Sequence, residues 1–153
     1  MLLVIFHIGK ERYALDSSHV LEIVPMVAFK KIPRAPEYLC GLFHYRGKIV
    51  PVIDVSCLSG EGVARRFLST RVILAEVRDF RGHLRTVGLL AERVTDTLKV
   101  REGDLTQAVV KLKEAPYLGD VITDALGMIL CIGVNELLSP EVQEMLFPND
   151  PES

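Results

Sequence analysis

Paired cysteines are missing from this chain of 153 residues. Its three cysteines, Cys40, Cys57 and Cys131, are an odd number and include no C-x-x-C spacing. A disulfide framework or a cysteine-rich metal site needs cysteines in pairs at short spacing. We therefore expect reduced, mostly buried thiols, a reducing compartment and no bound metal.

An excess of charge of either sign is also missing, because 18 Lys and Arg residues face 20 Asp and Glu residues, for a net charge of -2. A general nucleic-acid binder carries a basic stripe, whereas the charges here are interspersed along the sequence. We therefore expect no nucleic-acid partner. A small β-barrel that binds RNA or a ligand stays the alternative, and it would need a clustered basic face with exposed aromatic residues.

Long apolar runs are absent as well. The longest, Leu126–Val134, is less than half of the roughly 20 residues that a membrane-spanning helix needs. The apolar start Met1–Phe6 has no basic region before it and is soon followed by Lys10–Arg12, so we expect a first strand and not a signal peptide. The sequence predicts a cytoplasmic protein without direct membrane insertion, whose membrane association would come through partners.

Catalytic motifs are equally scarce. The four histidines have no H-x-x-x-H or H-E-x-x-H spacing, and no phosphate-binding G-x-x-x-x-G-K-[ST] motif occurs. Asp120 and Asp124 flank a turn but supply too few oxygen ligands for a calcium loop. We therefore expect no enzyme and no cofactor. A thiol enzyme centred on Cys40 is a further alternative, which rapid pH-dependent alkylation would favour.

The sequence instead contains many short apolar segments separated by turn residues, which predicts a mainly β fold of about ten strands. Hairpin turns are expected at Gly9–Glu11, Arg46–Lys48, Asp79–Gly82 and Asp124–Gly127. The expected strands are Leu2–Ile8, Arg12–Leu15, the two flanks of Arg46–Lys48, Arg71–Val77, Leu84–Leu90, Val94–Val100, Tyr117–Ile122 and Met128–Val134.

Two helical segments are expected. Asp16–Ser18 offers N-cap side chains for a short helical turn that carries Val20, Leu21 and Ile23. Ser139 and Pro140 suit the start of a C-terminal helix that ends near Phe147–Pro148, with an apolar stripe of Val142, Met145 and Leu146. Ser59–Arg66 is expected to be a linker, Arg101–Pro116 a loop with fragments of strand, and Asn149–Ser153 a frayed tail.

The segment Gly41–Asp54 is the most informative part of the chain. Gly47 supplies the positive φ that a tight hairpin turn needs, and Pro51 cannot donate to a ladder, which marks an edge or a bulge. Arg46 lies at the turn beside two aromatic residues, a setting that suits an anchor for a partner protein. The alternative is a turn arginine whose stem packs on Tyr45 or Phe43 and whose head is solvated.

The same segment resembles the signature of the CheW-type coupling proteins of bacterial chemotaxis-like signalling, Gly-apolar-x-Asn-x-Arg-Gly-x-apolar-x-Pro-Val-x-Asp. It departs at His44, where the family usually has asparagine. Matches in family order cover nearly the whole chain: Phe6–Gly9, Tyr13–Leu15, Val20–Ile23, Ile32–Pro33, Thr70–Leu74, Glu92–Asp96 and Leu126–Leu138. The segment Leu105–Ala108 lacks the arginine and proline that many members use in a ring-closing contact.

The resemblance implies a single CheW-like domain over residues 1–153. It would consist of two intertwined SH3-like five-stranded β-barrel subdomains packed together, with a short C-terminal helix. The implied function is a non-catalytic adaptor that couples chemoreceptors (methyl-accepting chemotaxis proteins) to a CheA-type histidine kinase. The implied partners are the cytoplasmic tip of the chemoreceptor and the regulatory domain of the kinase.

The resemblance also implies a receptor-binding surface made of Val20, Glu22, Gly41, Leu42, His44 and Arg46. A core valine and a turn glycine explain Val20 and Gly41 equally well. The missing side chain of Gly41 would let a partner helix approach the backbone closely. One ring nitrogen of His44 can still form a hydrogen bond, so this substitution is expected to change receptor choice.

Overall fold

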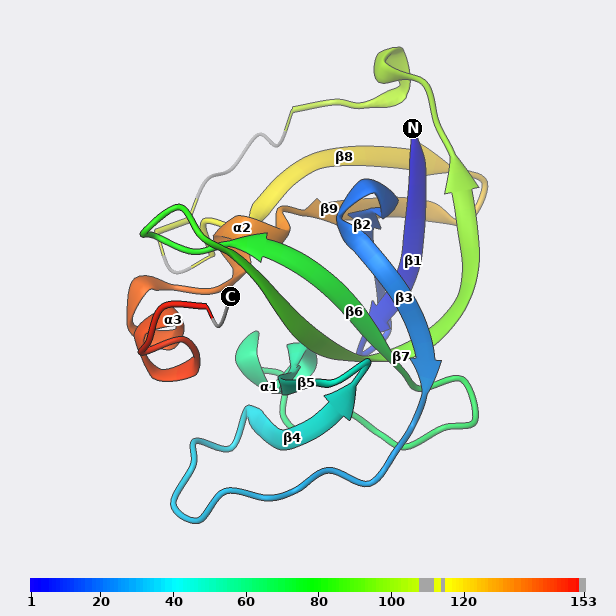
Figure 1. The fold of residues 1–153 in the computed structure, drawn as a ribbon. Coiled ribbons are helices and arrows are strands. Elements are labelled where there is room, and N and C mark those ends of the chain that lie inside the picture. Colours follow the sequence, from blue (N-terminus) through cyan, green and yellow to red (C-terminus); the bar gives the residue numbers. More distant parts are fainter. Residues whose placement is uncertain (108–111, 114, 152–153) are drawn as a thin grey trace.

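The computed structural model describes residues 1–107, 112–113 and 115–151, and it is built mainly of β-strands (Figure 1). The strands are β1 (Leu2–Ile8), β2 (Glu11–Asp16), β3 (Val20–Pro25), β4 (Leu39–Tyr45), β5 (Lys48–Asp54), β6 (Arg71–Arg78), β7 (Leu84–Lys99), β8 (Leu118–Asp124) and β9 (Gly127–Ile132). The helices are η1 (Ser17–His19), α1 (Val55–Leu58), η2 (Glu102–Asp104), α2 (Val134–Leu137) and α3 (Pro140–Leu146).

The strands form two five-stranded halves that share β7. In the first half the strand order is β7-β1-β2-β9-β8, and in the second half it is β3-β6-β7-β5-β4. The N-terminal part of β7 pairs with β6 and its C-terminal part pairs with β1, so one long strand belongs to both halves (Figure 1). The prediction of a mainly β fold with two five-stranded subdomains is confirmed.

Neither half is closed by a full ladder among the described residues. In each half, the chain that leaves one edge strand makes a single bridge to the other edge strand. After β3, Lys30 bridges Leu42 of β4 with N–O distances of 2.7 and 2.9 Å. After β7, Thr106 bridges Val121 of β8 with N–O distances of 2.9 and 2.7 Å. The subdomains are therefore open sheets whose edges are brought together by one bridge each.

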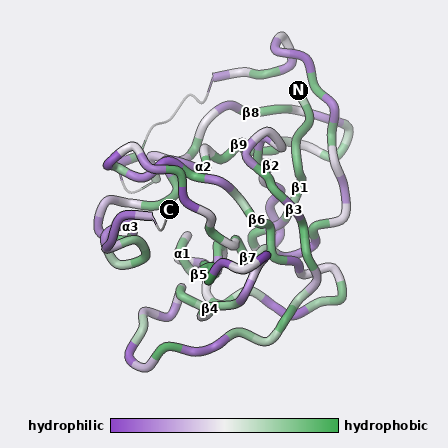
Figure 2. Tube along the Cα trace, viewed as in Figure 1, coloured by the Kyte–Doolittle hydropathy of each residue, from purple (hydrophilic) through white to green (hydrophobic). Residues whose placement is uncertain are grey.

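Three apolar cores follow from this arrangement. One lies inside the first half and includes Leu3 and Ile129, and one lies inside the second half and includes Val52 and Leu74. The largest contains residues of both halves and of the C-terminal helices, with Phe6 only 1% exposed. Figure 2 shows the apolar character of β1, which contributes to two of these cores.

Strand β7 is longer than the sequence predicts. Two separate strands were expected, ending at Leu90 and starting at Val94, but β7 runs without a break from Leu84 to Lys99. Arg93 has a φ of 50°, and the register with β1 shifts beside it, between Ile5 and His7. A bulge bends a strand without ending it, which explains why this irregularity resembles a strand boundary in the sequence.

The predicted N-terminal helical turn forms, but it is shorter than expected. The Asp16 carboxylate accepts a hydrogen bond from Ser18 N at 3.0 Å and caps η1, which ends at His19. Val20, Leu21 and Ile23 belong to β3 instead, because this segment pairs with β6. The prediction that they are helical is wrong.

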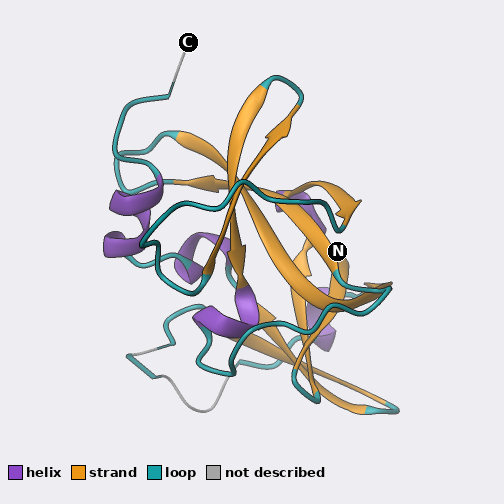
Figure 3. Ribbon diagram, turned by 90° about the horizontal axis from the view of Figure 1, so that it is seen from below, coloured by secondary structure: helices purple, strands orange, loops and turns teal. Residues whose placement is uncertain are grey.

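The predicted C-terminal helix is confirmed as α3, at the periphery of the molecule (Figure 3). Ser139 accepts a hydrogen bond from Val142 N at 3.2 Å. Val142 is buried, but Met145 is 38% exposed. The second buried apolar side chain of this segment is Phe147, which follows the helix. The short helices α1 and α2 were not predicted, and residues 108–111, 114 and 152–153 of the predicted loop and tail lie outside the described residues.

Candidate functional site

The β4–β5 turn presents Arg46 at the tip of a two-residue hairpin loop. Arg46 has a φ of 49° and Gly47 a φ of 79°, and Tyr45 pairs with Lys48 to close the turn. Two consecutive positive φ angles are typical of a type I′ turn, whose twist matches that of the flanking strands. The hairpin backbone therefore fixes the position from which the Arg46 side chain extends.

Pro51 lies where the prediction placed it, on an edge segment. It faces Leu42 in the β4–β5 ladder, and the pairing of β5 with β7 starts only at Val52. The missing N–H of Pro51 therefore removes no hydrogen bond from the β5–β7 ladder.

The Arg46 guanidinium contacts Glu22 on β3, the opposite edge strand of the same half. The distance from Arg46 Nη2 to Glu22 Oε1 is 2.9 Å, and the Arg46 side chain is still 75% exposed. The Tyr45 hydroxyl donates to the same Glu22 oxygen at 3.4 Å, and the guanidinium carbon lies 5.3 Å from the centre of the Tyr45 ring. An exposed pair of this kind contributes only about 0–1 kcal/mol, so a partner carboxylate can replace Glu22 at little cost.

Aromatic rings pack beside the contact of Arg46 with Glu22 and Tyr45. Tyr45 and Phe43 lie on the same face of β4 with ring centroids 6.5 Å apart, and Phe43 contacts Phe29 edge-on at 6.3 Å. The guanidinium carbon of Arg66 lies 6.0 Å from the centre of the Phe29 ring. A row of aromatic contacts therefore connects the Arg46 turn to the loop that contains Arg66.

Gly41 contacts another part of its own chain. It is buried, it has a φ of 142°, and a Cβ at this position would lie 2.5 Å from the carbonyl oxygen of Lys30. The β4–β5 register also shifts here, between Leu39 and Gly41. The close backbone approach that glycine allows is therefore made by Lys30, and the approach of a partner helix stays a prediction.

The remaining predicted residues are spread over different faces. Val20 is half-buried against the core shared by both halves. Leu42 and His44 alternate with Phe43 and Tyr45 along β4, so their side chains lie on the opposite face of the strand. Among the six predicted residues, Glu22 and Arg46 are the one pair that hydrogen bonds or ion pairs join to each other within the described ranges.

Sequence analysis missed exposed apolar side chains on the strands that carry this pair. Leu21 is 47% exposed and Ile23 38% exposed, and both alternate with the less exposed Glu22 along β3. Ile49 after the turn is 65% exposed. The signal was the alternation of β3, which the incorrect helical prediction for this segment concealed. The hydrogen bond of Tyr45 to Glu22 was also missed, because it joins two strands that are distant in sequence.

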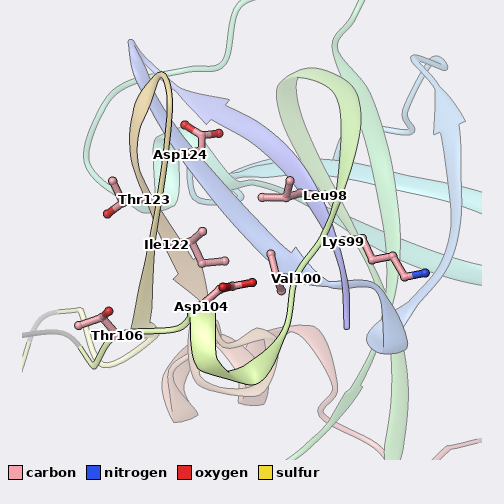
Figure 4. A pocket seen from close by; sticks show the side chains of 8 residues that line it. All are labelled: Leu98, Lys99, Val100, Asp104, Thr106, Ile122, Thr123 and Asp124. Atoms are coloured by element: carbon pink, nitrogen blue, oxygen red, sulfur yellow. The ribbon is translucent and has the colours of Figure 1, made fainter.

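A cavity of about 350 Å³ lies at the end of the first half, between the chain after β7 and strand β8 (Figure 4). Its wall includes Asp124, whose carboxylate accepts two hydrogen bonds from Arg12, at 2.6 and 2.8 Å. These bonds lower the pKa of Asp124 to about 2. None of the six predicted residues lines this cavity, and no group of metal-binding side chains occurs in the part of the chain that the structure describes.

The three cysteines are free and half-buried. Burial raises the pKa of the Cys40 thiol to about 12 and contributes most to raising the pKa values of Cys57 and Cys131 to about 11. A thiol nucleophile reacts as the thiolate, which is scarce at neutral pH for such groups. The structure therefore does not favour a thiol enzyme centred on Cys40. No helix among the described residues has the length and apolar character needed to cross a bilayer.

The fold and the exposed Arg46 turn define a small two-part β protein with SH3-like halves, built around one shared strand. The family model of the CheW-like domain matches residues 2–141, so the chain belongs to the CheW-like domain family. This confirms the resemblance found in the sequence.

Individual relatives support the assignment over most of the chain. The chain is 26% identical over 144 residues to the chemotaxis protein CheW of Rhizobium meliloti, covering 93% of this chain and 90% of that protein. It is 24% identical to protein FrzA of Myxococcus xanthus, covering 88% of this chain and 77% of that protein. The crystal structure of the scaffolding protein TtCheW from Thermoanaerobacter tengcongensis matches with a TM-score of 0.80 and 29% identity, covering 95% of this chain and 92% of that chain.

Proposed function

We propose that this protein is a non-catalytic adaptor of a bacterial chemosensory complex. It couples the cytoplasmic tip of a chemoreceptor to the regulatory domain of a CheA-type histidine kinase. The observation that carries the proposal is the family match over residues 2–141, together with a structural likeness to a scaffolding protein over 95% of the chain. The adaptor works in the cytoplasm, needs no cofactor, and reaches the membrane only through its receptor partner.

The residues proposed for receptor binding are Arg46, Glu22, Val20, Gly41, Leu42 and His44, and Glu22 is the one that contacts Arg46 directly within the described residues. Arg46 supports this role because its side chain is 75% exposed and its planar guanidinium can form two parallel hydrogen bonds to a carboxylate. The contacts with Glu22 and with the Tyr45 ring orient the guanidinium before a partner binds. Exchange of Glu22 for a receptor carboxylate, or for carbonyl groups at a helix end, would then form the contact.

Individual contacts in such a complex need only moderate strength. A dissociation constant near 1 μM corresponds to about -8 kcal/mol, and multivalent assembly adds avidity. A small surface with one charged anchor beside an aromatic ring is consistent with that requirement.

Replacement of Arg46 by glutamate tests the proposal. Arg46→Glu places a second carboxylate beside Glu22, so we expect receptor pull-down and receptor-dependent kinase activation to be lost. The thermal unfolding of the variant should change little, because the side chain is exposed. The measurement is kinase autophosphorylation reconstituted with purified kinase and candidate receptors.

Lys10 provides the matched control, since it is an exposed cation in the β1–β2 turn of the other half. We expect Lys10→Glu to retain full coupling. If Arg46→Glu still couples receptor to kinase at normal strength, the site assignment is wrong.

A further inference from the structure

The loop between α1 and β6 gathers cations that are scattered in the sequence. We call residues 63–70 the basic loop. The guanidinium carbon of Arg65 lies 4.9 Å from the centre of the Phe67 ring, and that of Arg93, from the bulge in β7, lies 4.4 Å from the same ring. Arg66 extends from the same loop over Phe29 of the segment after β3. The fold therefore collects a basic surface in a chain whose net charge is -2.

The basic loop is held in place by its own hydrogen bonds. The hydroxyl of the buried Thr70 accepts from Phe67 N at 2.9 Å and donates to the carbonyl of Arg65 at 2.6 Å. The Asp54 carboxylate accepts from Ala64 N at 2.8 Å and fixes the start of the loop. Because the loop is ordered before any partner arrives, binding there requires little further loss of conformational entropy.

The cations of this surface differ in how they are neutralised. Arg65 forms an ion pair with the buried carboxylate of Glu92 at 3.2 Å. Arg66 and Arg93 are exposed, and within residues 1–107, 112–113 and 115–151 no carboxylate forms an ion pair with either. These two guanidinium groups keep unused hydrogen-bond donors at the surface.

Apolar groups lie beside these cations. Leu68 is 97% exposed and Val63 is 55% exposed. Val63 and Arg66 also line a cavity of about 250 Å³ together with Lys31, Ile32 and Pro36. Glu37 and Asp54 line it as well, but both carboxylates already accept hydrogen bonds, Glu37 from Cys57 Sγ and Asp54 from Ala64 N. The cavity is thus a partly apolar depression whose lining includes two cations, Lys31 and Arg66, and the exposed Leu68 belongs to the same loop as Arg66.

We propose that the basic loop and this cavity form a docking surface for an acidic segment of a partner protein. Carboxylates of the segment would bind Arg66, Arg93 and Lys31, and one of its apolar side chains would enter the cavity. None of the six residues proposed for receptor binding lines this cavity or belongs to the basic loop, and the proposal does not depend on that assignment.

Two features favour a protein segment over a nucleic acid. The Phe67 ring already contacts two guanidinium groups of its own chain, which leaves little of it open for a stacking base. A partly apolar cavity and an exposed leucine suit an apolar side chain better than a phosphate backbone. A membrane surface is less well matched, because the depression is concave.

The test uses fluorescence anisotropy with the full chain. The probe is a short fluorescein-labelled synthetic peptide in which glutamates flank a leucine and a phenylalanine, and its counterpart has lysines in place of the glutamates. We expect the acidic peptide to bind and to be weakened by added salt, and the lysine peptide not to bind. We expect Arg66→Glu to weaken acidic-peptide binding about tenfold or more.

Two exposed leucines give a matched pair for the apolar contribution. Leu68→Ser should weaken binding several-fold, whereas Leu126→Ser, at an 84% exposed leucine of the β8–β9 turn, should leave it unchanged. Lys10→Glu and Arg46→Glu should also bind the acidic peptide normally, which separates this surface from the proposed receptor site. Circular dichroism melts confirm that each variant is folded.

Three results would overturn the proposal. One is equal binding of the acidic and lysine peptides. Another is acidic-peptide binding that neither Arg66→Glu nor Leu68→Ser weakens in the folded protein. The third is binding to a single-stranded oligonucleotide, or to phosphatidylglycerol vesicles, that is tighter than binding to the acidic peptide. In that case Arg66→Glu and Leu68→Ser would abolish the tighter binding.

Discussion

Gly41 lies where the backbone of β4 passes closest to the segment after β3. A Cβ there would lie 2.5 Å from the Lys30 carbonyl oxygen, and the φ of 142° belongs to a region that residues with a side chain rarely adopt. This backbone contact belongs to the bridge that draws the two edges of the second half together. A substitution at Gly41 therefore acts first on the shape of the second half, before any effect on partner binding.

We expect Gly41→Ala to lower the free energy of unfolding by about 1–3 kcal/mol from backbone strain, with a further loss from the collision with Lys30. Gly47→Ala is the matched control, because Gly47 also has a positive φ but nothing lies within 4 Å of the position of its Cβ. Urea unfolding of both variants separates the two effects. A Gly41→Ala variant as stable as the Gly47→Ala variant would contradict the assignment.

At the same scale, the sequence analysis selected both Arg46 and Glu22 but did not predict that they form an ion pair. The Arg46–Gly47 turn follows from local rules, because both residues adopt positive φ within one two-residue loop. The ion pair with Glu22 joins opposite edges of a curved sheet. Such a contact depends on how five strands close on one another, which no short segment of the sequence specifies.

Among the elements, α1 and the basic loop depend on one buried carboxylate. Asp54 is the last residue of β5 and is 2% exposed. One of its oxygens accepts from Cys57 N at 3.1 Å and caps α1, and the other accepts from Ala64 N at 2.8 Å. A single side chain thus fixes the helix and the loop that follows it.

We expect Asp54→Ala to cost about 1–3 kcal/mol of unfolding free energy, because two backbone donors lose their acceptor in a buried site. The amide hydrogens of Cys57 and Ala64 should exchange faster with solvent. Native-state hydrogen exchange followed by NMR measures both amides. The role assigned to Asp54 fails if these two amides keep the protection they have in the unaltered protein.

The ion pair between Arg12 of β2 and Asp124 of β8 gives the first half a pH-dependent contact. The hydrogen bonds from Arg12 lower the pKa of Asp124 to about 2, below the value of about 3.9 that an aspartate has in an unfolded chain. A carboxylate whose pKa is lower in the folded state stabilises the fold above its unfolded pKa. That stabilisation is lost as the pH falls from about 4 towards 2.

We therefore expect Asp124→Asn to lower stability at neutral pH and to flatten the pH dependence of stability between about pH 4 and pH 2. Asp120→Asn is the control, because it removes a carboxylate of the same strand that forms no ion pair within the described ranges. Urea midpoints at a series of pH values test this. A slope unchanged by Asp124→Asn would show that the Arg12 contact does not form in solution.

Prediction from sequence succeeded for the hairpins and failed for β7 because the two depend on different information. The turn at Asp79–Gly82 has local signals in Gly82 and in the Asp79 side chain, whose Oδ1 accepts hydrogen bonds from the backbone N–H groups of Arg81 and His83. The continuity of β7 through Arg93 depends on β1 pairing across the bulge. That pairing brings together residues nearly ninety positions apart. Strand propensity is a local property and therefore cannot predict such a pairing.

In the molecule as a whole, the two halves cannot be separated without dividing β7 and the largest core. That core takes Phe6 and Leu15 from the first half and Ile53 and Ile73 from the second half, and it extends to Phe147 after α3. A shared strand makes the pairing of β1 depend on the same backbone as the pairing of β6. The two halves should therefore unfold together, as the predicted single domain requires.

Phe6→Ala tests this cooperativity, because Phe6 is 1% exposed in the shared core and its ring lies 6.1 Å from that of Tyr13. Truncation of a buried phenylalanine to alanine costs about 3–5 kcal/mol, a large part of the roughly 5–15 kcal/mol that stabilises a typical domain. Because the halves share β7, the slowest-exchanging amides of β9 and of β5 should lose protection by the same amount, although only β9 belongs to the half that contains Phe6. Hydrogen exchange in both strands measures this, and a loss confined to β9 would show that the halves are independent domains joined by a long strand.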